Sequence, residues 1–186
     1  MGERPAPGAL AVIGARSLRL RLWLRARASL ATVRVDIRGP IRLSNDTRLL
    51  VGRRTETDLV VRGPVLVEEG STLSLAGGSL RLAPGALLGP GTVVETSNGR
   101  VELGPGCRLE MGVVLRARGG AIEVGEGATL ADRVVCSSGP GAPIWIGPGA
   151  TVGVNATVLG GALVPPGETV PALAVLGPGG QRDVLR

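Results

Sequence analysis

The sequence contains no histidine, lysine, phenylalanine or tyrosine. The absence of histidine limits its catalytic and metal chemistry, and the near absence of aromatic residues limits its core. Without histidine, the chain has no imidazole to act as a general base or to bind a metal. With only two Trp and no other aromatic residue among 186 residues, a hydrophobic core must be built from aliphatic side chains. The two cysteines, Cys107 and Cys136, form neither a disulfide framework nor a zinc cluster, so we expect no metal site and expect both to serve as small apolar residues.

The basic residues, all of them arginine, are concentrated near the N-terminus. Residues 1–62 hold 13 Arg against 5 acidic residues, whereas residues 63–186 hold 8 against 10. The stretch SLRLRLWLRAR (17–27) alternates apolar and mostly basic positions, as a strand with one basic face does. We interpret residues 1–36 as a basic capping segment. It could instead contact an anionic membrane surface or a partner enzyme, whereas nucleic acid is disfavoured because no set of stacking aromatic residues accompanies the arginines.

Aliphatic residues recur every sixth position along most of the chain, a spacing that fits neither an α-helix nor simple strand alternation. After every third hexad the step lengthens to nine or ten residues. Of the 22 positions in this series, 20 are Ile, Leu or Val. The positions are Ile37, Leu43, Leu49, Thr55, Val61, Val67, Leu73, Leu82, Leu88, Val94, Leu103, Leu109, Leu115, Val124, Leu130, Cys136, Ile146, Val152, Val158, Val164, Val170 and Leu176.

Hexapeptide periodicity of this kind predicts an all-β fold, a parallel β-helix in which three hexads make one coil of a triangular prism. We expect about seven coils over residues 37–176, followed by a C-terminal tail at 177–186. The longer steps predict insertions at one corner of the prism. Inward residues of successive coils, such as Leu103, Val124 and Ile146, should stack above one another. Small residues at other inward corner positions fit the same geometry, namely Cys107, Ala128, Ala150, Ala156 and Ala162.

Three stretches resemble the hexapeptide-repeat acyltransferases of the left-handed β-helix superfamily, nearest to bacterial sugar and polysaccharide O-acetyltransferases. They are NGRVELGPGCRLEMGVVL (98–115), GGAIEVGEGATLADRVV (119–135) and PIWIGPGATVGVNATVL (143–159). The resemblance implies a left-handed coil. It also implies a homotrimer that binds acyl-CoA and an acceptor between adjacent prisms.

The chain departs from that family at its functional parts. The family's catalytic histidine would follow the hexad corresponding to residues 130–138, where this chain reads LADRVVCSS and then GPGAP. The three-histidine zinc site of the related γ-class carbonic anhydrases is excluded for the same reason. The segment ALVPPGETVPALAVLGPGG is also shorter than the final coils that help the family hold the pantetheine arm of CoA.

Several residues are candidates for a site in spite of these departures. Asp132 should face outward near the place of the missing histidine, and Ser138 lies at the inserted corner, so these two are the catalytic candidates. Glu102, Glu123 and Trp145 should stack in one outward column above Arg81. That column is either a solvated ion-pair ladder or a substrate-binding patch. Asn155, the fourth substrate-binding candidate, either braces its coil or contacts substrate.

Three functions are compatible with these features. The first is a non-catalytic relative of the acyltransferases, acting as an oligomeric scaffold or as the partner of an enzyme. The second is an acyl-CoA-dependent O-acyltransferase with a base other than histidine, acting on a sugar or secondary-metabolite acceptor. The third is a filament former like the bactofilins. No apolar run is long enough to span a membrane, so we expect a cytoplasmic, bacterial protein that could be membrane-peripheral.

Overall fold

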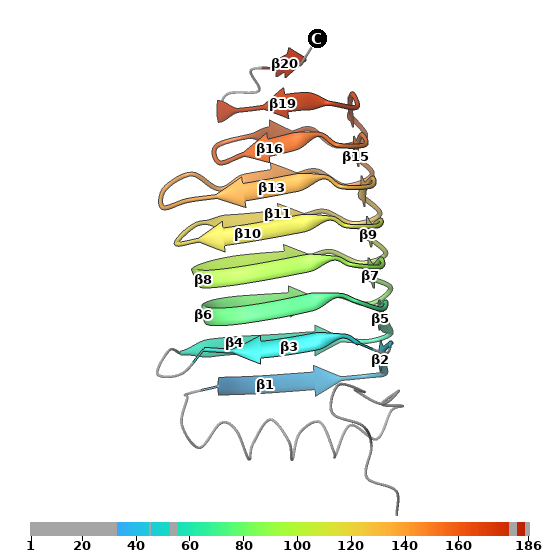
Figure 1. Cartoon of the computed structure of the whole chain (residues 1–186), viewed down its shortest axis with the longest axis vertical. Helices are drawn as coiled ribbons and strands as arrows, with labels where there is room; N and C mark the ends of the chain where they lie inside the picture. Colours follow the sequence, from blue (N-terminus) through green and yellow to red (C-terminus); the bar gives the residue numbers. More distant parts are fainter. Residues whose placement is uncertain (1–32, 45, 53–55, 179–181, 185–186) are drawn as a thin grey trace, which may run out of the picture.

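The chain folds into a stack of β-strands that wind around one axis (Figure 1). The computed structural model describes residues 33–44, 46–52, 56–178 and 182–184. Twenty strands, and no α-helix, are found in these residues. Residues 1–32, which contain the predicted basic strand, lie outside the described part.

The strands form three walls, named here in chain order. The first wall contains β1 (Val33–Arg38), β4 (Thr57–Arg62), the second halves of β6 (Thr72–Leu82) and β8 (Val93–Leu103), β11 (Ala121–Val124), β14 (Ile144–Ile146) and β17 (Leu163–Val164). The second wall contains β2 (Ile41–Leu43), β5 (Val65–Val67), β7 (Leu87–Leu88), β9 (Arg108–Leu109), β12 (Thr129–Leu130), β15 (Thr151–Val152) and β18 (Thr169–Val170). The third wall contains β3 (Arg48–Val51), the first halves of β6 and β8, β10 (Val114–Arg118), β13 (Val135–Ser138), β16 (Thr157–Leu159) and β19 (Ala174–Leu176).

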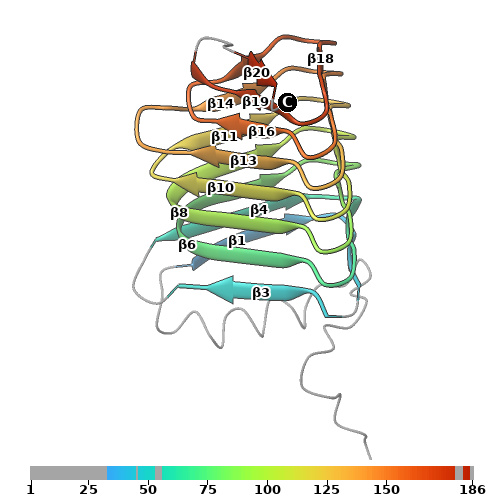
Figure 2. The ribbon, with the colours of Figure 1, turned by 45° about the horizontal axis from the view of Figure 1, so that its top comes forward.

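All three walls are parallel, and the seven strands of the second wall confirm about seven coils. In Figure 1 the near strands β10, β13 and β16 run from right to left while the chain climbs from bottom to top. The coil is therefore left-handed, as the resemblance implied. Figure 2 shows the coils stacked as rungs around a common interior.

The residues that recur every sixth position form the core, as predicted. Each of the 21 predicted inward positions that the structure describes is buried, and none is more than 8% exposed. Thr55 falls outside the described residues. Leu103, Val124 and Ile146 are direct register partners across β8, β11 and β14, so the predicted stacking is confirmed.

A second inward column, absent from the six-residue series, runs along the first wall. It lies two residues before the predicted one and is equally buried, consisting of Leu59, Leu80, Val101, Ile122 and Ile144. The inserted residues produce it, because they lengthen the strand on which each coil enters the first wall. In β6 and β8 the strand continues through the corner between the third and first walls without a break.

The two ends differ from the predicted boundaries in detail. β1 begins at Val33, ahead of residue 37, and pairs along its whole length with β4. At the other end, β20 (Arg182–Val184) lies within the predicted tail and pairs antiparallel with β19. In the part of the chain that the structure describes, no helix has the length and hydropathy that a membrane span requires.

Candidate functional site

The predicted outward column on the first wall is present. Arg81 pairs in register with Glu102, Glu102 with Glu123, and Glu123 with Trp145, on four successive coils. Since parallel strands lie about 4.8 Å apart, these side chains leave the wall at nearly equal intervals along the axis.

Both carboxylates of the column are bound by arginines. Arg81 Nη1 donates to Glu102 Oε1 at 2.8 Å. Arg100 Nη1 lies 3.6 Å from the same oxygen, and Arg100 also donates a hydrogen bond to Glu123. These side chains are partly exposed, so each pair stabilises the fold by only about 0.2–1 kcal/mol. The ladder is therefore an ion-pair network rather than an isolated acidic patch.

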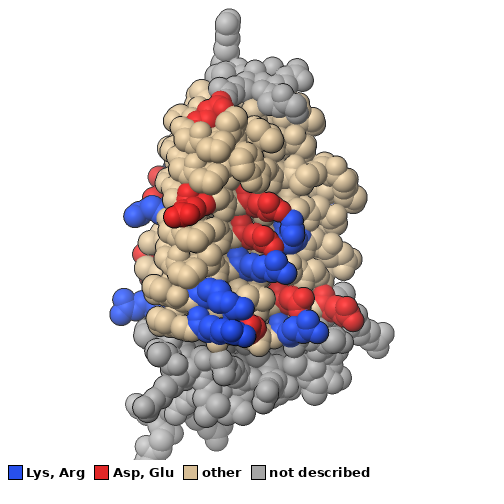
Figure 3. All heavy atoms as spheres, turned by 180° about the vertical axis from the view of Figure 1, so that it is seen from behind, with Lys and Arg blue, Asp and Glu red and all other residues tan. Residues whose placement is uncertain are grey.

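A shallow groove of about 560 Å³ runs beside this column. Its floor is made by Ala83, Gly104 and Gly125, which have little or no side chain, and Arg62 borders its lower end. Figure 3 views this face and shows acidic side chains above basic ones in its middle. The volume is in the range of small-ligand sites, but the floor offers few polar groups because its backbone is hydrogen-bonded between coils.

Below the groove, two arginines converge on one carboxylate of β1. Arg62 Nη2 donates to Asp36 Oδ2 at 2.9 Å, and Arg38 Nε donates to Asp36 Oδ1 at 3.2 Å. The hydrogen bond from Arg62, assisted by Arg38, lowers the pKa of Asp36 below its usual value. Asp36 therefore remains charged under mildly acidic conditions.

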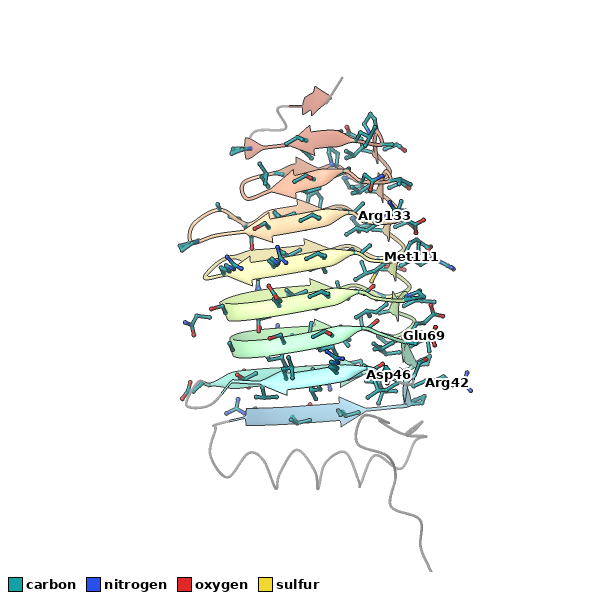
Figure 4. All side chains as sticks on the ribbon, viewed as in Figure 1. Arg42, Asp46, Glu69, Met111 and Arg133 are labelled. Atoms are coloured by element: carbon teal, nitrogen blue, oxygen red, sulfur yellow. The ribbon has the colours of Figure 1, made fainter. Side chains whose placement is uncertain are left out.

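Asp132 lies elsewhere, at the corner between the second and third walls. Its Oδ1 accepts a hydrogen bond of 3.1 Å from the backbone N–H of Met111 on the preceding coil. The side chain of the neighbouring Arg133 lies over Gly112 of that same preceding turn. Figure 4 shows Met111 and Arg133 at this corner on adjacent coils. One oxygen of the Asp132 carboxylate is thus used to fasten one coil to the next.

Ser138 ends β13 and faces inward. It is only 2% exposed, and its hydroxyl has no hydrogen-bond partner in the described structure. Its catalytic role remains a prediction, and the burial argues against that role because a substrate cannot reach the oxygen. Sequence reasoning placed Ser138 at the corner, whereas β13 continues two residues beyond the inward Cys136 and turns Ser138 into the core.

Asn155 is exposed and adopts a left-handed backbone conformation, with φ of 56°. It occupies the turn position that holds Gly112 and Arg133 in the two coils below, at φ of 69° and 57°. Its backbone N–H donates to the carbonyl oxygen of Asp132 at 2.9 Å. Asn tolerates this conformation better than most residues, which accounts for its presence without a substrate. Its role in substrate binding stays a prediction.

Both cysteines are buried and behave as the composition predicts. Burial raises the pKa of Cys107 and of Cys136 to about 12. A thiol with so high a pKa is neither a nucleophile nor a metal ligand near neutral pH. Among the described residues, no group of His, Cys, Asp or Glu is arranged to hold a metal ion.

The candidates therefore do not form one site within a protomer. Glu102, Glu123 and Trp145 lie together on the first wall, Asp132 and Asn155 lie at the opposite corner, and Ser138 is inside. Sequence reasoning missed Arg100, although it lies two residues before Glu102 and so on the same side of β8. It also missed Arg62, because the residue in register with Arg81 on the coil below is Val60, and Arg62 lies two residues farther along the same side of β4.

Comparison with known proteins adds a likeness of fold only. No protein-family model matches the chain, and no curated protein matches it. Among solved structures, it is similar to a perosamine N-acetyltransferase from Caulobacter crescentus in complex with CoA and GDP-perosamine, with a TM-score of 0.43, 17% identity and coverage of 94% of this chain and 67% of that one. It is also similar to the polySia-specific acetyltransferase NeuO, with a TM-score of 0.45, 14% identity and coverage of 83% and 86%.

A third similar structure is a hexapeptide-repeat acetyltransferase from Vibrio cholerae in complex with acetyl coenzyme A. It has a TM-score of 0.29 and 12% identity, and the match covers 92% of this chain and 79% of that one. At such identities the likeness does not extend to the site.

Proposed function

We propose that this β-helix is a non-catalytic relative of the hexapeptide-repeat acyltransferases and serves as an oligomeric scaffold or as the partner of an enzyme. One observation supports this most directly: both catalytic candidates are constrained, Ser138 by burial and Asp132 by a hydrogen bond at one of its two carboxylate oxygens. Asp132 binds the Met111 backbone through Oδ1, and the Ser138 hydroxyl is buried. A sequence without histidine offers no imidazole in their place.

The third wall supports the oligomeric part of the proposal. Its outward column is β-branched on five successive coils and only partly covered, comprising Val93, Val114, Val135, Thr157 and Val175. Leu159 beside it is 40% exposed. A flat apolar strip of this kind on a parallel β-wall is suited to contact with another protein. The homotrimer implied by the resemblance is one assembly that would cover it.

Acyl-CoA binding and turnover test the proposal. We expect calorimetry to detect no binding of acetyl-CoA, and we expect no release of free thiol from acetyl-CoA over a panel of sugar and amine acceptors. Affinity purification under native conditions should recover a stoichiometric second protein or homo-oligomers alone. Sustained, enzyme-dependent thiol release would refute the non-catalytic assignment.

An acyl-CoA-dependent O-acyltransferase with a non-histidine base is the second candidate. It is supported by the second oxygen of Asp132, which has no hydrogen-bond partner among the described residues. If turnover is seen, Asp132→Asn should abolish it, because the amide can still accept from Met111 but cannot take a proton. An unchanged rate in that variant would eliminate Asp132 as the base.

The remaining expectations concern assembly and location. A bactofilin-like filament would sediment at high speed, whereas a closed oligomer has one discrete mass, a small multiple of 18.8 kDa. We propose a cytoplasmic location. Contact between the arginine-rich segment before residue 33 and an anionic membrane is tested by co-sedimentation with phosphatidylserine vesicles.

A further inference from the structure

The charges on the outer face of the first wall are ordered along the solenoid axis. The lower coils carry four arginines, Arg34, Arg38, Arg62 and Arg81, against two acids, Asp36 and Asp58, which gives a net charge of +2. The upper coils carry Glu102 and Glu123 with one arginine, Arg100, which gives −1. The wall is therefore positive toward its N-terminal end and negative above it, with the change of sign between the coils of Arg81 and Glu102.

We propose that the first wall is a docking surface for a second copy of this chain, bound face to face and antiparallel. The two-fold axis lies in the interface, across the solenoid, between the coils of Arg81 and Glu102. This inference goes beyond the scaffold role and holds whether or not the chain is catalytic.

The antiparallel arrangement makes the two faces complementary. Arg81 of each copy faces the coil of Glu102 in the other, and Arg62 faces the coil of Glu123. A parallel arrangement would place each arginine opposite the same arginine of the partner, and like charges brought together at an interface cost several kcal/mol. Asp36 lies in the same outward column as Arg81, since Asp36 pairs with Val60 and Val60 with Arg81. The Arg62 guanidinium donates to Asp36 and therefore lies beside this column.

The same axis matches the outer coils as well. The coil of Trp145 faces the coil of Asp36 and Arg38 in the second copy. The Arg38 side chain is 74% exposed, and its one ion pair with a described residue is with Asp36, which leaves its outer face available to pack on an indole. Tryptophan and arginine are the residue types most enriched among those that dominate binding energy at interfaces.

The wall is large enough for a specific but weak dimer. The axis pairs six coils, and six coils at about 4.8 Å with strands of about five residues at 3.3 Å give a face of about 500 Å² per copy. The total of about 1,000 Å² lies at the lower limit for a biological interface. Its charged composition predicts an association that weakens as salt rises.

A charge exchange between two variants tests the proposal. Sedimentation equilibrium at low salt should give wild-type protein a mass of an even number of protomers: two, or six if the third wall also forms a trimer. Glu123→Arg and Arg62→Glu should each halve that number. An equimolar mixture of the two variants should restore it, because the introduced arginine of one copy then faces the introduced glutamate of the other, and the remaining wild-type pair is kept.

The matched controls are Glu126→Arg and Arg42→Glu. They make the same charge changes on exposed residues away from the first wall's outer face and should leave the mass unchanged. Circular dichroism and thermal melts confirm that each variant is folded. If Arg62→Glu unfolds, salt is the second measurement: raising NaCl from about 0.05 M to about 0.5 M should dissociate the wild-type assembly to half its mass.

A wild-type mass of one or three protomers overturns the proposal. So does a folded single variant that keeps the wild-type mass, a mixture of folded variants that fails to restore it, or a wild-type mass that salt does not change. None of these results bears on acyl-CoA turnover, so failure here is distinct from failure of the non-catalytic assignment.

Discussion

Buried hydroxyl groups in this core are of two kinds. Ser71, fully buried, donates its hydroxyl to the carbonyl oxygen of Gly89 on the next coil at 3.1 Å. Thr47 and Thr92 likewise donate to a carbonyl oxygen of the next coil, that of Glu68 and that of Glu110. Ser138 and Thr96, in contrast, are buried with no partner for the hydroxyl in the described structure. A buried polar group costs free energy unless it is bonded, so the two kinds should respond differently to mutation.

Ser138→Ala should leave the free energy of unfolding unchanged or raise it by up to about 1 kcal/mol, because it removes a buried hydroxyl that makes no hydrogen bond. Ser71→Ala, the matched control, should lower it by about 1–2 kcal/mol because the Gly89 carbonyl oxygen loses its donor. Urea denaturation of both variants measures the difference. A loss of stability in Ser138→Ala as large as in Ser71→Ala would mean that Ser138 has a partner after all.

The two cysteine thiols should be unreactive in the folded protein. Burial raises the pKa of Cys107 and Cys136 to about 12, so the reactive thiolate is scarce at pH 8 and the sulfur is also inaccessible. Ellman's reagent should titrate no thiol in native protein and both thiols in denaturant. Reaction of a native thiol within minutes would contradict the burial. The same result ensures that thiol released from acetyl-CoA can be measured without background.

At the scale of the strand and turn, the corner between the third and first walls depends on glycine. Gly78 has φ of 84°, and a Cβ placed there would lie 1.9 Å from the carbonyl oxygen of Gly99 on the next coil. Gly127, at another corner, has φ of 63° but nothing within 4 Å of such a Cβ. The first glycine is required by close approach and the second only by backbone conformation.

Gly78→Ala should therefore be far more damaging than Gly127→Ala. We expect Gly127→Ala to cost about 1–2 kcal/mol, the usual penalty for a side chain in the left-handed region. Gly78→Ala must also push two coils apart, and we expect a loss above about 4 kcal/mol or an insoluble protein. Thermal melts compare the two, and equal melting temperatures would show that the corner can relax.

The sequence predicts the strands and the inward and outward columns well where the six-residue period is regular. The period of six with nine-residue steps identifies the coil, the stacking of Leu103 on Val124, and the outward column that ends at Trp145. It does not show that the strands run on through the inserted corner. For that reason it misplaces Ser138 and omits the column of Leu80 and Ile122. Ion pairs such as Arg100 with Glu123 depend on side-chain rotamers across coils, which periodicity does not determine.

On the scale of the whole molecule, each described coil pairs its strands only with those of the coils above and below it. Stability in such a solenoid is a sum of coil and nearest-neighbour terms. A coil in the middle has two neighbours, while the last coil has one neighbour and the short antiparallel strand β20. The same substitution should therefore act globally in the middle and locally at the end.

Leu109 and Leu176 allow that comparison, since both are buried leucines, 0% and 1% exposed, in the second wall of a middle coil and the third wall of the last. Leu109→Ala should lower the free energy of global unfolding by about 2–5 kcal/mol and raise amide exchange in β7, β9 and β12 together. Leu176→Ala should raise exchange mainly in β19 and β20 and change the global midpoint less, because the last coil can open while the others remain paired. Hydrogen exchange with urea denaturation measures both effects. If Leu176→Ala raised exchange equally in β7 and β9, the coils would unfold as a single unit and the nearest-neighbour description would be wrong.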